Sequence, residues 1–249
     1  MFKNERYDRI LEILEEENYV SAATLSKRLY VSMPTIRRDL SELQRRGLIV
    51  RSHGGAKKIQ PEHAVAPLNF RKTKNSTEKR RLCKSAARLV HEQDVVFIDA
   101  STTTMQMADF LDAKKNITVI TNGIQLATLL VKKGIRTYCT GGEIFENSLA
   151  HFGSFAEEFI KRFNIDVLFF SCYGVSEKGI LTDPSLPETQ IRKVAIQQAK
   201  KTVFLCDKSK FSLTAPYNLI SITELDCIVT NAKEEIARFS GVREVILTE

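Results

Sequence analysis

The sequence predicts an α/β chain of two parts: a small N-terminal winged helix-turn-helix domain followed by a larger, mostly parallel α/β domain. Three short amphipathic segments and a hairpin occupy the first 58 residues, and further along the chain buried β-branched strands alternate with helices. Charge follows the same division, because residues 1–81 hold 18 Lys and Arg against 10 Asp and Glu, whereas residues 82–249 hold 19 against 20. A basic N-terminal part that binds a polyanion is the simplest explanation, and a solvated basic surface is the alternative.

Composition excludes several protein classes. The 249 residues are 43% hydrophobic and 27% charged, which is typical of a folded, water-soluble protein. The longest apolar runs, such as Val95–Ile98 and Val167–Phe170, are too short to cross a bilayer, and the N-terminus lacks the apolar core of a signal peptide. Five cysteines without metal-ligand spacing favour neither a disulfide framework nor a metal site. We therefore expect a cytoplasmic protein with no membrane association, metal or cofactor.

The N-terminal domain is predicted from apolar residues at helical spacing. They form three faces: Tyr7, Ile10, Leu11 and Leu14; Leu25 and Leu29; and Ile36, Leu40 and Leu43. Ser21 and Ser32 stand where N-caps of the second and third helices are needed, and Gly47 stands where the third helix can end. Residues 48–52 then predict a strand, and Gly54-Gly55 a turn.

A polar segment with Pro61 and Pro67 follows and predicts a linker. The expected domains are therefore residues 1–58, a linker over 59–76, and residues 77–249. Seven strands are predicted beyond the linker: Val95–Asp99, Ile117–Thr121, Ile135–Thr140, Val167–Ser171, Thr202–Asp207, Cys227–Thr230 and Val242–Leu247. Helices are predicted between most of them: Lys79–Val90, Thr103–Leu111, Ile124–Lys132, Phe155–Lys161, Glu188–Lys200 and Lys233–Phe239. In a parallel sheet of this kind ligands bind beyond the carboxyl ends of the strands.

The short connection between helices two and three is typical of a helix-turn-helix unit, whose second helix enters the major groove of DNA. Hydroxyls and guanidinium groups off the core face of helix three suit phosphate oxygens and guanine edges, and the hairpin suits the flanking backbone. The candidate DNA-binding residues are Ser32, Thr35, Arg37, Arg38, Arg51 and His53. The alternative is a protein-interaction module whose arginines are solvated.

Asp39 stands apart within this basic helix. A carboxylate there would repel phosphate, so we expect it to form an ion pair that orients Arg37, Arg38 or a neighbouring basic side chain, rather than to contact a base.

The order of these residues resembles a known signature. Residues 31–40, VSMPTIRRDL, followed by residues 51–56, RSHGGA, are similar to the V-S-x-x-T-I-R-R-D-L and R-x-H-G-G-A motifs of DeoR-type transcriptional regulators. The resemblance extends over nearly the whole chain. One departure is Tyr30, which stands in a turn where many helix-turn-helix units carry glycine.

Polar residues also follow the predicted strands of the second domain. Four consecutive hydroxyl residues at a helix start suit a phosphate, although an ordinary helix cap needs only one. The candidates at the strand ends and on the helix after Pro184 and Pro187 are Asp99, Ser101, Thr102, Thr103, Thr104, Thr121, Asn122, Gly141, Gly142, Glu188, Arg192, Lys193, Asp207 and Lys210. We expect them to converge on one rim of the sheet, with Lys210 able to neutralise a phosphate.

These stretches resemble the sensor domain of the same regulators, where D-x-x-T-T, T-N, G-G, E-x-x-x-R-K and D-x-S-K-F occur in this order. That domain is similar in fold to ribose-5-phosphate isomerase, and the resemblance implies a phosphorylated sugar as effector. The first loop departs from the family, because Ala100-Ser101 stand where a glycine is frequent. Without glycine this loop cannot easily adopt positive φ.

The resemblance thus implies a transcriptional regulator, in the first place a repressor of a sugar-metabolism operon, that binds double-stranded operator DNA as a homo-oligomer, either a dimer or a tetramer. The rival hypothesis is a phosphosugar isomerase-like enzyme with a DNA-binding head, using Glu188, Asp207 and Lys210 as base and electrophile. Against it, residues 174–179 lack the paired carboxylates that a sugar isomerase places there, so we expect no catalytic residue. A pure interaction adaptor is a weaker third hypothesis.

A basic run continues past the hairpin: Arg71, Lys72, Lys74, Lys79, Arg80 and Arg81. Either these side chains lie along DNA beside the half-site, or they belong to a solvated linker. We favour DNA contact, because Arg51, Lys57 and Lys58 lead directly into this stretch.

Overall fold

The structure is a computed structural model, and it describes residues 3–17, 19–45, 48–52, 54–58, 68–145 and 147–248. The chain forms two compact units, Met1–Phe70 and Arg71–Glu249, which we call the head and the sensor unit. The point of division lies inside the predicted linker over 59–76. Pro61, Pro67 and Gly47 lie outside the described residues.

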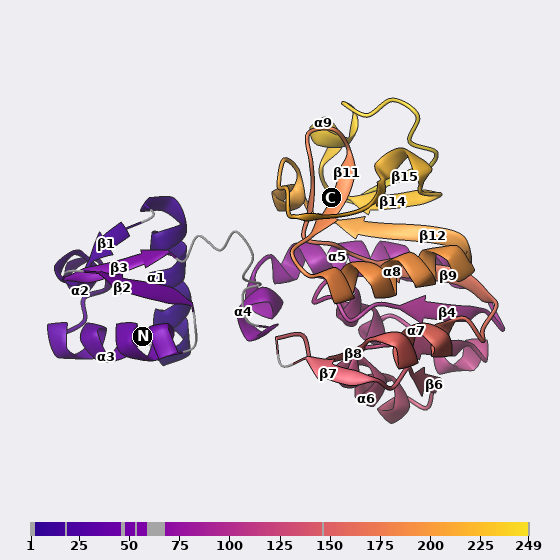
Figure 1. The fold of residues 1–249 in the computed structure, drawn as a ribbon, viewed down its shortest axis with the longest axis horizontal. Coiled ribbons are helices and arrows are strands. Elements are labelled where there is room, and N and C mark those ends of the chain that lie inside the picture. Colours follow the sequence, from indigo (N-terminus) through magenta and orange to yellow (C-terminus); the bar gives the residue numbers. More distant parts are fainter. Residues whose placement is uncertain are drawn as a thin grey trace. The chain divides into compact units, whose positions relative to one another are not determined.

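The head consists of helices and a small antiparallel sheet (Figure 1). Its elements are α1 (Lys3–Glu17), β1 (Tyr19–Ser21), α2 (Ala22–Leu29), α3 (Met33–Arg45), β2 (Ile49–Ser52) and β3 (Gly55–Lys58). The strand order is β1-β3-β2, and the β2–β3 hairpin pairs Ile49 with Lys58 and Ser52 with Gly55. The predicted winged helix-turn-helix arrangement is therefore confirmed, with β1 as a strand that the sequence did not predict.

Local chemistry sets the ends of α2. The Ser21 hydroxyl accepts a hydrogen bond from the Thr24 amide at 3.0 Å, which confirms the predicted N-cap. Tyr30 ends the helix with φ at 53°, in the left-handed region where glycine is favoured, and its ring is 96% exposed. The bulky residue is thus accommodated because its side chain points to solvent.

An ion pair between α1 and α3 closes the head. Asp39 is only 3% exposed and accepts hydrogen bonds from Nε and Nη2 of Arg6, the latter at 3.1 Å. The expected partnership with a neighbouring basic side chain is therefore found, although the partner is Arg6 and neither of the adjacent arginines. Two parallel hydrogen bonds fix the angle of α3, because guanidinium and carboxylate meet in one plane.

The sensor unit is built on a seven-stranded sheet with short accessory strands. Its strands are β4 (Val95–Ile98), β5 (Thr118–Thr121), β6 (Arg136–Cys139), β7 (Glu143–Phe145), β8 (Ala150–Phe152), β9 (Ile165–Phe170), β10 (Gly174–Val175), β11 (Ile180–Asp183), β12 (Ala199–Cys206), β13 (Tyr217–Ser221), β14 (Cys227–Thr230) and β15 (Val245–Leu247). The main sheet has the order β15-β14-β12-β9-β4-β5-β6, and every described pairing within it is parallel. This confirms the mostly parallel α/β fold.

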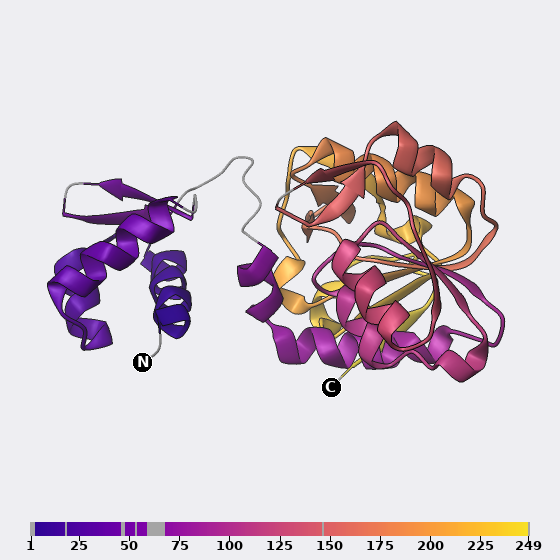
Figure 2. The same ribbon diagram turned by 90° about the horizontal axis from the view of Figure 1, so that it is seen from below.

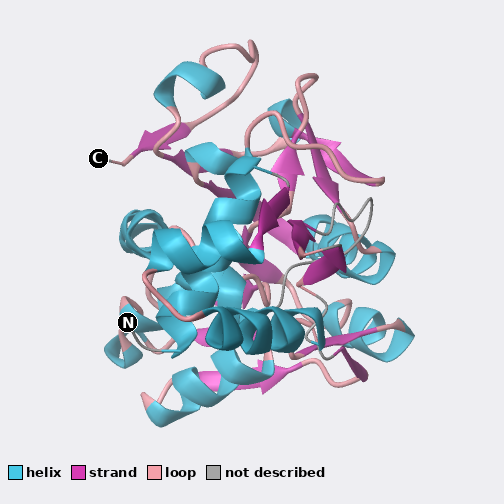
Figure 3. Ribbon diagram, turned by 90° about the vertical axis from the view of Figure 1, so that its left-hand side faces the viewer, coloured by secondary structure: helices cyan, strands magenta, loops and turns pink. Residues whose placement is uncertain are grey.

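Helices accompany the sheet on both faces (Figures 1 and 2). The α-helices are α4 (Leu68–Thr73), which spans the division between the units, α5 (Ser76–Ala86), α6 (Ile124–Lys132), α7 (Ser154–Ile160), α8 (Leu186–Gln198) and α9 (Lys233–Ile236). Short 3₁₀ turns cover Ala87–Leu89, Thr104–Asp109, Ala113–Lys115, Lys208–Lys210 and Ile222–Glu224. Figure 3 distinguishes these helices from the strands by colour.

Alternating side chains of the strands form two hydrophobic cores. Phe97, Leu168 and Phe204 point into the core shared with α7 and α8, whereas their neighbours Ile98 and Phe169 point into the core shared with α5 and α6. Because successive residues of a strand face opposite sides, a sheet covered on both faces needs apolar residues at every position. This explains the continuous apolar runs that predict these strands.

The strand order reverses direction between β4 and β9. From β4 the chain proceeds outward through β5 and β6, then returns to β9 on the other side and continues through β12, β14 and β15. At such a point the loops at the carboxyl ends separate and leave a crevice. Asp99 follows β4 and Ser171 follows β9, so both lie at this crevice.

Three details differ from the expectations. Residues 68–76 of the predicted linker belong largely to α4 and to the start of α5. The left-handed backbone of Asn75 separates these two helices. The predicted helix over Thr103–Leu111 is a 3₁₀ turn, since hydroxyl side chains at its start bond locally and tighten it. The antiparallel sheet β10-β11-β13 was not predicted, because its strands mix polar and apolar residues and have no continuous apolar run.

We predict that Asp39→Asn lowers the unfolding free energy of the head by about 3 kcal/mol, because it removes the carboxylate charge from a mostly buried ion pair with Arg6. Hydrogen exchange followed by mass spectrometry on peptides from α1 and α3 measures this. Glu12→Gln is the matched control, because it removes an exposed pair with Arg9 and should change little. Equal effects of the two substitutions would contradict the structural role of Asp39.

Candidate functional site

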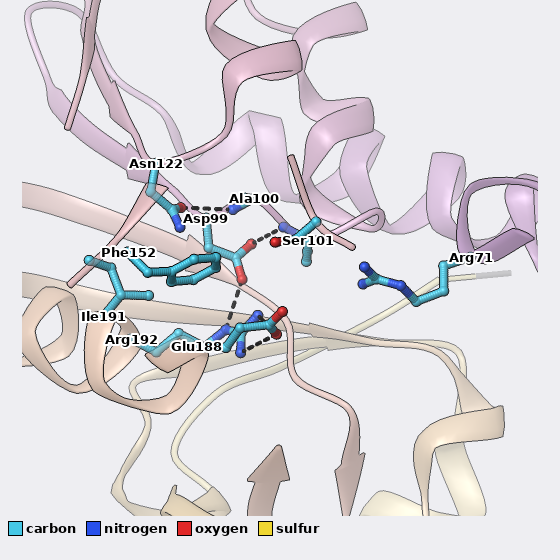
Figure 4. Close-up of a pocket in the computed structure, with 10 residues that line it drawn as sticks. Arg71, Asp99, Ala100, Ser101, Asn122, Phe152, Glu188, Ile191 and Arg192 are labelled. Atoms are coloured by element: carbon cyan, nitrogen blue, oxygen red, sulfur yellow. Dashed lines mark hydrogen bonds and ion pairs between the residues drawn. The ribbon is translucent and has the colours of Figure 1, made fainter. Parts of the chain in front are cut away.

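A pocket lies at the carboxyl ends of β4 and β5, where the strand order reverses (Figure 4). It has about 260 Å³ of empty volume, part of it open to solvent. Residues from α4, the β4 and β5 loops, the β7–β8 hairpin and α8 line it: Arg71, Asp99, Ala100, Ser101, Asn122, Ser148, Phe152, Glu188, Ile191 and Arg192. Polar groups thus converge on one side of a small apolar floor made by Phe152 and Ile191.

Arg192 organises the acidic side of the pocket. Its Nε donates to Asp99 Oδ2 at 3.0 Å, its Nη1 donates to Asp183 Oδ2 at 2.7 Å, and Glu188 Oε2 lies 3.4 Å from Nη1. Burial acts to lower the pKa of Arg192, but Asp183, Asp99 and Glu188 outweigh burial and raise it well above its ordinary value. The guanidinium therefore stays charged, and three carboxylates surround one cation.

Asp99 also shapes the loop after β4. Its Oδ1 accepts hydrogen bonds from the Ser101 amide at 3.2 Å and from the Thr104 hydroxyl at 2.5 Å, and its Oδ2 accepts from the Ser171 amide at 3.4 Å. Neither Ala100 nor Ser101 has positive φ, so this loop does without the glycine that is frequent in the family. The hydroxyls predicted to cradle a phosphate are partly used to hold the loop itself.

Asn122 and Ser148 complete the rim. The Asn122 side chain accepts from the Ala100 amide at 3.0 Å and donates to the His151 carbonyl at 3.2 Å, which joins the β4 and β5 loops to β8. The Ser148 hydroxyl is buried and has no hydrogen-bond partner among the described residues, and the residue is 7% exposed. A buried hydroxyl beside a cavity is expected to find a partner, so Ser148 points to a polar ligand.

The structure divides the predicted effector residues into two groups. Asp99, Ser101, Asn122, Glu188 and Arg192 line the pocket. The remaining ones do not: Thr102, Thr103, Thr104, Thr121, Gly141, Gly142, Lys193, Asp207 and Lys210.

Several of this second group have structural partners. Lys210 Nζ donates to the Cys172 carbonyl at 2.8 Å and to the Ser171 hydroxyl, so it joins the ends of β9 and β12. Asp207 Oδ1 caps the turn that follows β12 by accepting from the Ser209 amide at 3.0 Å. Thr121 Oγ1 accepts from the Gly123 amide at 3.0 Å. Hydroxyl, carboxylate and ammonium groups at strand ends therefore serve the loops as well as the site.

Backbone conformation and close packing explain the two glycines after β6. Gly141 and Gly142 have φ of +70° and +108°, and a Cβ on Gly142 would lie 2.5 Å from the Phe152 carbonyl oxygen. Thr103 Oγ1 is buried without a partner, and Lys193 is half-buried on α8 beside Arg192.

Five pocket residues were not predicted from the sequence as site residues: Arg71, Ala100, Ser148, Phe152 and Ile191. Asp183, which anchors Arg192, was missed too. Of these residues, only Asp183 could have been recognised from the sequence, because it is an acidic residue at the end of a strand, directly before the Pro184 loop. Arg71 looked like one more charge in a basic run.

In the head, the candidate residues of α3 and the hairpin are held together. Arg51 Nη1 donates to the Ser41 hydroxyl at 2.9 Å, and that hydroxyl donates to the Arg37 carbonyl at 2.8 Å, so Ser41 joins the hairpin to α3. Arg37 and Arg38 are exposed, and neither has an ion-pair partner among the described residues. The Ser32 and Thr35 hydroxyls lie 2.9 Å apart.

His53 lies outside the described residues, but the glycines after it are accounted for. Gly54 has φ of +74°, and a Cβ on Gly55 would lie 2.3 Å from the Val20 carbonyl oxygen. The first glycine supplies the turn and the second permits β1 to approach β3.

Two family models match the chain. The DeoR-like helix-turn-helix domain matches residues 6–62, and the DeoR C terminal sensor domain matches residues 74–232. The chain belongs to the DeoR family of DNA-binding transcriptional regulators.

This DeoR-family chain is similar over nearly its full length to curated relatives. It is 33% identical to the HTH-type transcriptional regulator FruR of Bacillus subtilis strain 168 over 234 residues, 94% of this chain and 93% of the relative. It is 31% identical to the glycerol-3-phosphate regulon repressor of Escherichia coli K12 over 239 residues, 95% and 94% of the two chains. Ribose 5-phosphate isomerase A from Methanocaldococcus jannaschii aligns over 55% of each chain, with 17% identity and a TM-score of 0.41.

Two further observations describe this DeoR-family chain. No helix among the described residues is long and apolar enough to span a membrane. Four of the five cysteines are buried and Cys139 is half-buried, and all five are free thiols.

The basic run of this DeoR-family chain is engaged within the sensor unit. Lys79 is 5% exposed and donates to the Arg71 carbonyl and to the Thr102 hydroxyl, Lys72 donates to Gln125, and Arg80 pairs with Asp109. Both alternatives for the basic run, contact with flanking DNA and a solvated linker, are therefore wrong for Lys79 and Lys72. The sequence could not reveal this, because burial of a lysine ammonium depends on partners distant in the chain.

We predict a pH-dependent contribution of Lys79 to stability. Burial, and next Lys210, lower its pKa from 10.5 to about 8. Between pH 8 and 10.5 the unfolded chain therefore holds a proton that the folded chain has lost, so the stability contributed by Lys79 rises with pH, by at most about 1.4 kcal/mol per pH unit. Urea unfolding of wild type and Lys79→Met at pH 7.5, 8.5 and 9.5 should show that the unfolding free energy of wild type, relative to that of the variant, increases with pH.

The control for this measurement is Lys84→Met, because Lys84 lies exposed on the same helix, α5. Its pH dependence should parallel that of wild type over this range. Parallel curves for Lys79→Met as well would show that the buried ammonium does not titrate as predicted.

Proposed function

We propose that this chain is a transcriptional repressor whose sensor unit binds a phosphorylated sugar or polyol and whose head binds operator DNA. The observation that carries the proposal is the pocket at the strand-order reversal, where Asp99, Asn122, Glu188 and Arg192 converge above an apolar floor. Carboxylates and an amide suit the hydroxyls of a sugar, and the unpartnered Ser148 hydroxyl supplies a further hydrogen bond.

The relatives support the chemical class of the effector. One relative at 31% identity is named as the repressor of a glycerol-3-phosphate regulon, and glycerol 3-phosphate is a phosphorylated polyol. Binding alters transcription only if the ligand has different affinity for the DNA-competent state and the released state.

The head supports operator recognition through α3 and the hairpin. We propose that Arg37 and Arg38 read base edges or phosphates while Ser32, Thr35, Arg51 and His53 contact the flanking backbone. Helix-turn-helix proteins usually read two half-sites through a symmetric oligomer, so we propose a homo-oligomer, either a dimer or a tetramer.

We propose no enzymatic activity. An isomerase needs a free base and an electrophile at the substrate. Of the three residues in the isomerase hypothesis, Glu188 is paired with Arg192 at 3.4 Å, and Asp207 and Lys210 lie outside the pocket with partners of their own. Hydrogen–deuterium exchange at C2 of sugar phosphates, followed by NMR, tests this, and exchange above the enzyme-free rate would revive the isomerase hypothesis.

The direct test of effector binding is a thermal-shift screen of the full chain with glycerol 3-phosphate, fructose 1-phosphate, fructose 6-phosphate, glucose 6-phosphate and the matching unphosphorylated compounds. A ligand at a hundred times its Kd adds about 2.7 kcal/mol of stability. We expect at least one phosphorylated compound, and not its unphosphorylated counterpart, to raise Tm. If none does, the proposed effector class is wrong.

We predict that Glu188→Gln weakens binding of the stabilising compound about tenfold, because a charged acceptor of sugar hydroxyl bonds becomes neutral. Isothermal titration calorimetry measures the change. Glu158→Gln is the matched control, because Glu158 is exposed on α7 and pairs only with Lys161 in the described structure. Unchanged affinity of Glu188→Gln would remove Glu188 from the effector site.

We also predict that Arg37→Ala or Arg38→Ala weakens specific operator binding by about 1–3 kcal/mol per half-site and leaves the fold intact. Gel shifts on the operator and on a scrambled duplex of the same length measure specificity. Arg9→Ala removes the same charge from α1 and serves as the control, with binding near that of wild type. Wild-type affinity in both α3 variants would exclude these arginines from the interface.

A further inference from the structure

Arg71 reaches the pocket from α4, the helix that spans the division between head and sensor unit. Its guanidinium points into the pocket opposite Asp99 and Glu188 (Figure 4). Its Nη2 donates to the Asn147 carbonyl at 2.7 Å, beside Ser148 on the β7–β8 hairpin. Burial lowers the pKa of Arg71, and the negative charge of Glu188 is the strongest influence that raises it. The two side chains therefore interact electrostatically across the pocket. A guanidinium nevertheless remains charged.

The backbone at Arg71 is fixed by buried and half-buried lysines. Lys79 Nζ donates to the Arg71 carbonyl, and Lys79 is 5% exposed. The adjacent Lys72 donates to Gln125 on α6. Burying an ammonium is costly unless it is hydrogen-bonded, so these contacts hold the end of α4 firmly on the sensor unit. The backbone of Arg71 is thus held in place, and its side chain extends from α4 into the pocket.

Charge gives the pocket two unlike ends. At one end Asp99, Asp183 and Glu188 surround the single cation of Arg192, which leaves an excess of negative charge that repels a phosphate dianion and suits neutral hydroxyls. At the other end Arg71 supplies a positive charge beside the unpartnered Ser148 hydroxyl. Guanidinium and phosphate form paired, charge-assisted hydrogen bonds. A ligand with hydroxyls at one end and a phosphate at the other is thereby oriented.

We propose that Arg71 binds the phosphate of the effector and, through α4, makes the chain segment that joins sensor unit to head respond to effector occupancy. This inference rests on the proposed function and adds to it the orientation of the ligand and the route of regulation. The two compact units divide between Phe70 and Arg71. Arg71, the residue proposed to bind the phosphate, is therefore the first residue of the sensor unit. Effector contact and interdomain connection thus share one helix.

The test uses full-length wild type, Arg71→Gln, Arg71→Lys and the control Arg81→Gln, which removes an equal charge from an exposed position on α5. Calorimetry with the stabilising sugar phosphate from the screen, and gel shifts on operator DNA with and without that compound, give affinity and response separately. We expect Arg71→Gln to bind the compound at least tenfold more weakly, Arg71→Lys to fall between, and Arg81→Gln to match wild type. The coupling is measured as the ratio of operator affinity with and without the compound for each protein, so a loss of ligand-free affinity in a variant of the basic run does not enter it.

The response at saturating ligand tests the coupling. Arg71→Gln saturated with the compound should show at least a fivefold smaller change in operator affinity than wild type. Wild-type ligand affinity in Arg71→Gln would overturn phosphate binding, and a full response at saturation would overturn the role of α4. If the proposed function itself is wrong, wild type will bind none of the compounds. That result differs from a loss of binding in Arg71→Gln alone, and it would also overturn the role of Arg71.

Discussion

The sensor unit depends on one buried cation, the guanidinium of Arg192. Its carboxylate partners come from three places: Asp99 follows β4, Asp183 ends β11, and Glu188 lies one turn earlier on α8. The main sheet, the accessory sheet and the helix that covers one face are thereby joined at the point where the strand order reverses. Removing one partner of a buried ion pair is far costlier than the net stabilisation of the pair suggests, so this cluster sets both the fold of the rim and the charge of the pocket.

Much of the fold was predictable because its signals are local. The buried strands read as continuous apolar runs since both faces of the sheet are covered, and Ser21 marked the start of α2 through its hydroxyl. The accessory strands β10, β11 and β13 were not predictable, because they contain glycine and polar residues and lack the continuous apolar runs of the buried parallel strands. Asp39 was predictable as an ion-pair partner, but its partner Arg6 was not, since 33 residues separate them.

The candidate site divides in the same way. Asp99, Asn122 and Glu188 were found from their positions after strands and at a helix start, which place side chains at the crevice whatever the details of packing. Lys210 follows a strand too, yet its ammonium bonds to the end of β9 and lies outside the pocket. Arg71 was predicted to contact DNA because it belongs to a basic run, and the sequence gives no sign that the folded chain places its side chain at an acidic pocket.

We propose that a phosphorylated ligand occupies this pocket and that its binding stabilises α4. Hydrogen exchange of the full chain, measured with and without the stabilising sugar phosphate, tests this proposal. We expect slower exchange in peptides that cover the loop at Asp99–Thr104, the first turns of α8 and the α4 segment over 68–75. Slower exchange confined to other parts of the sensor unit, with these three peptides unchanged, would contradict it.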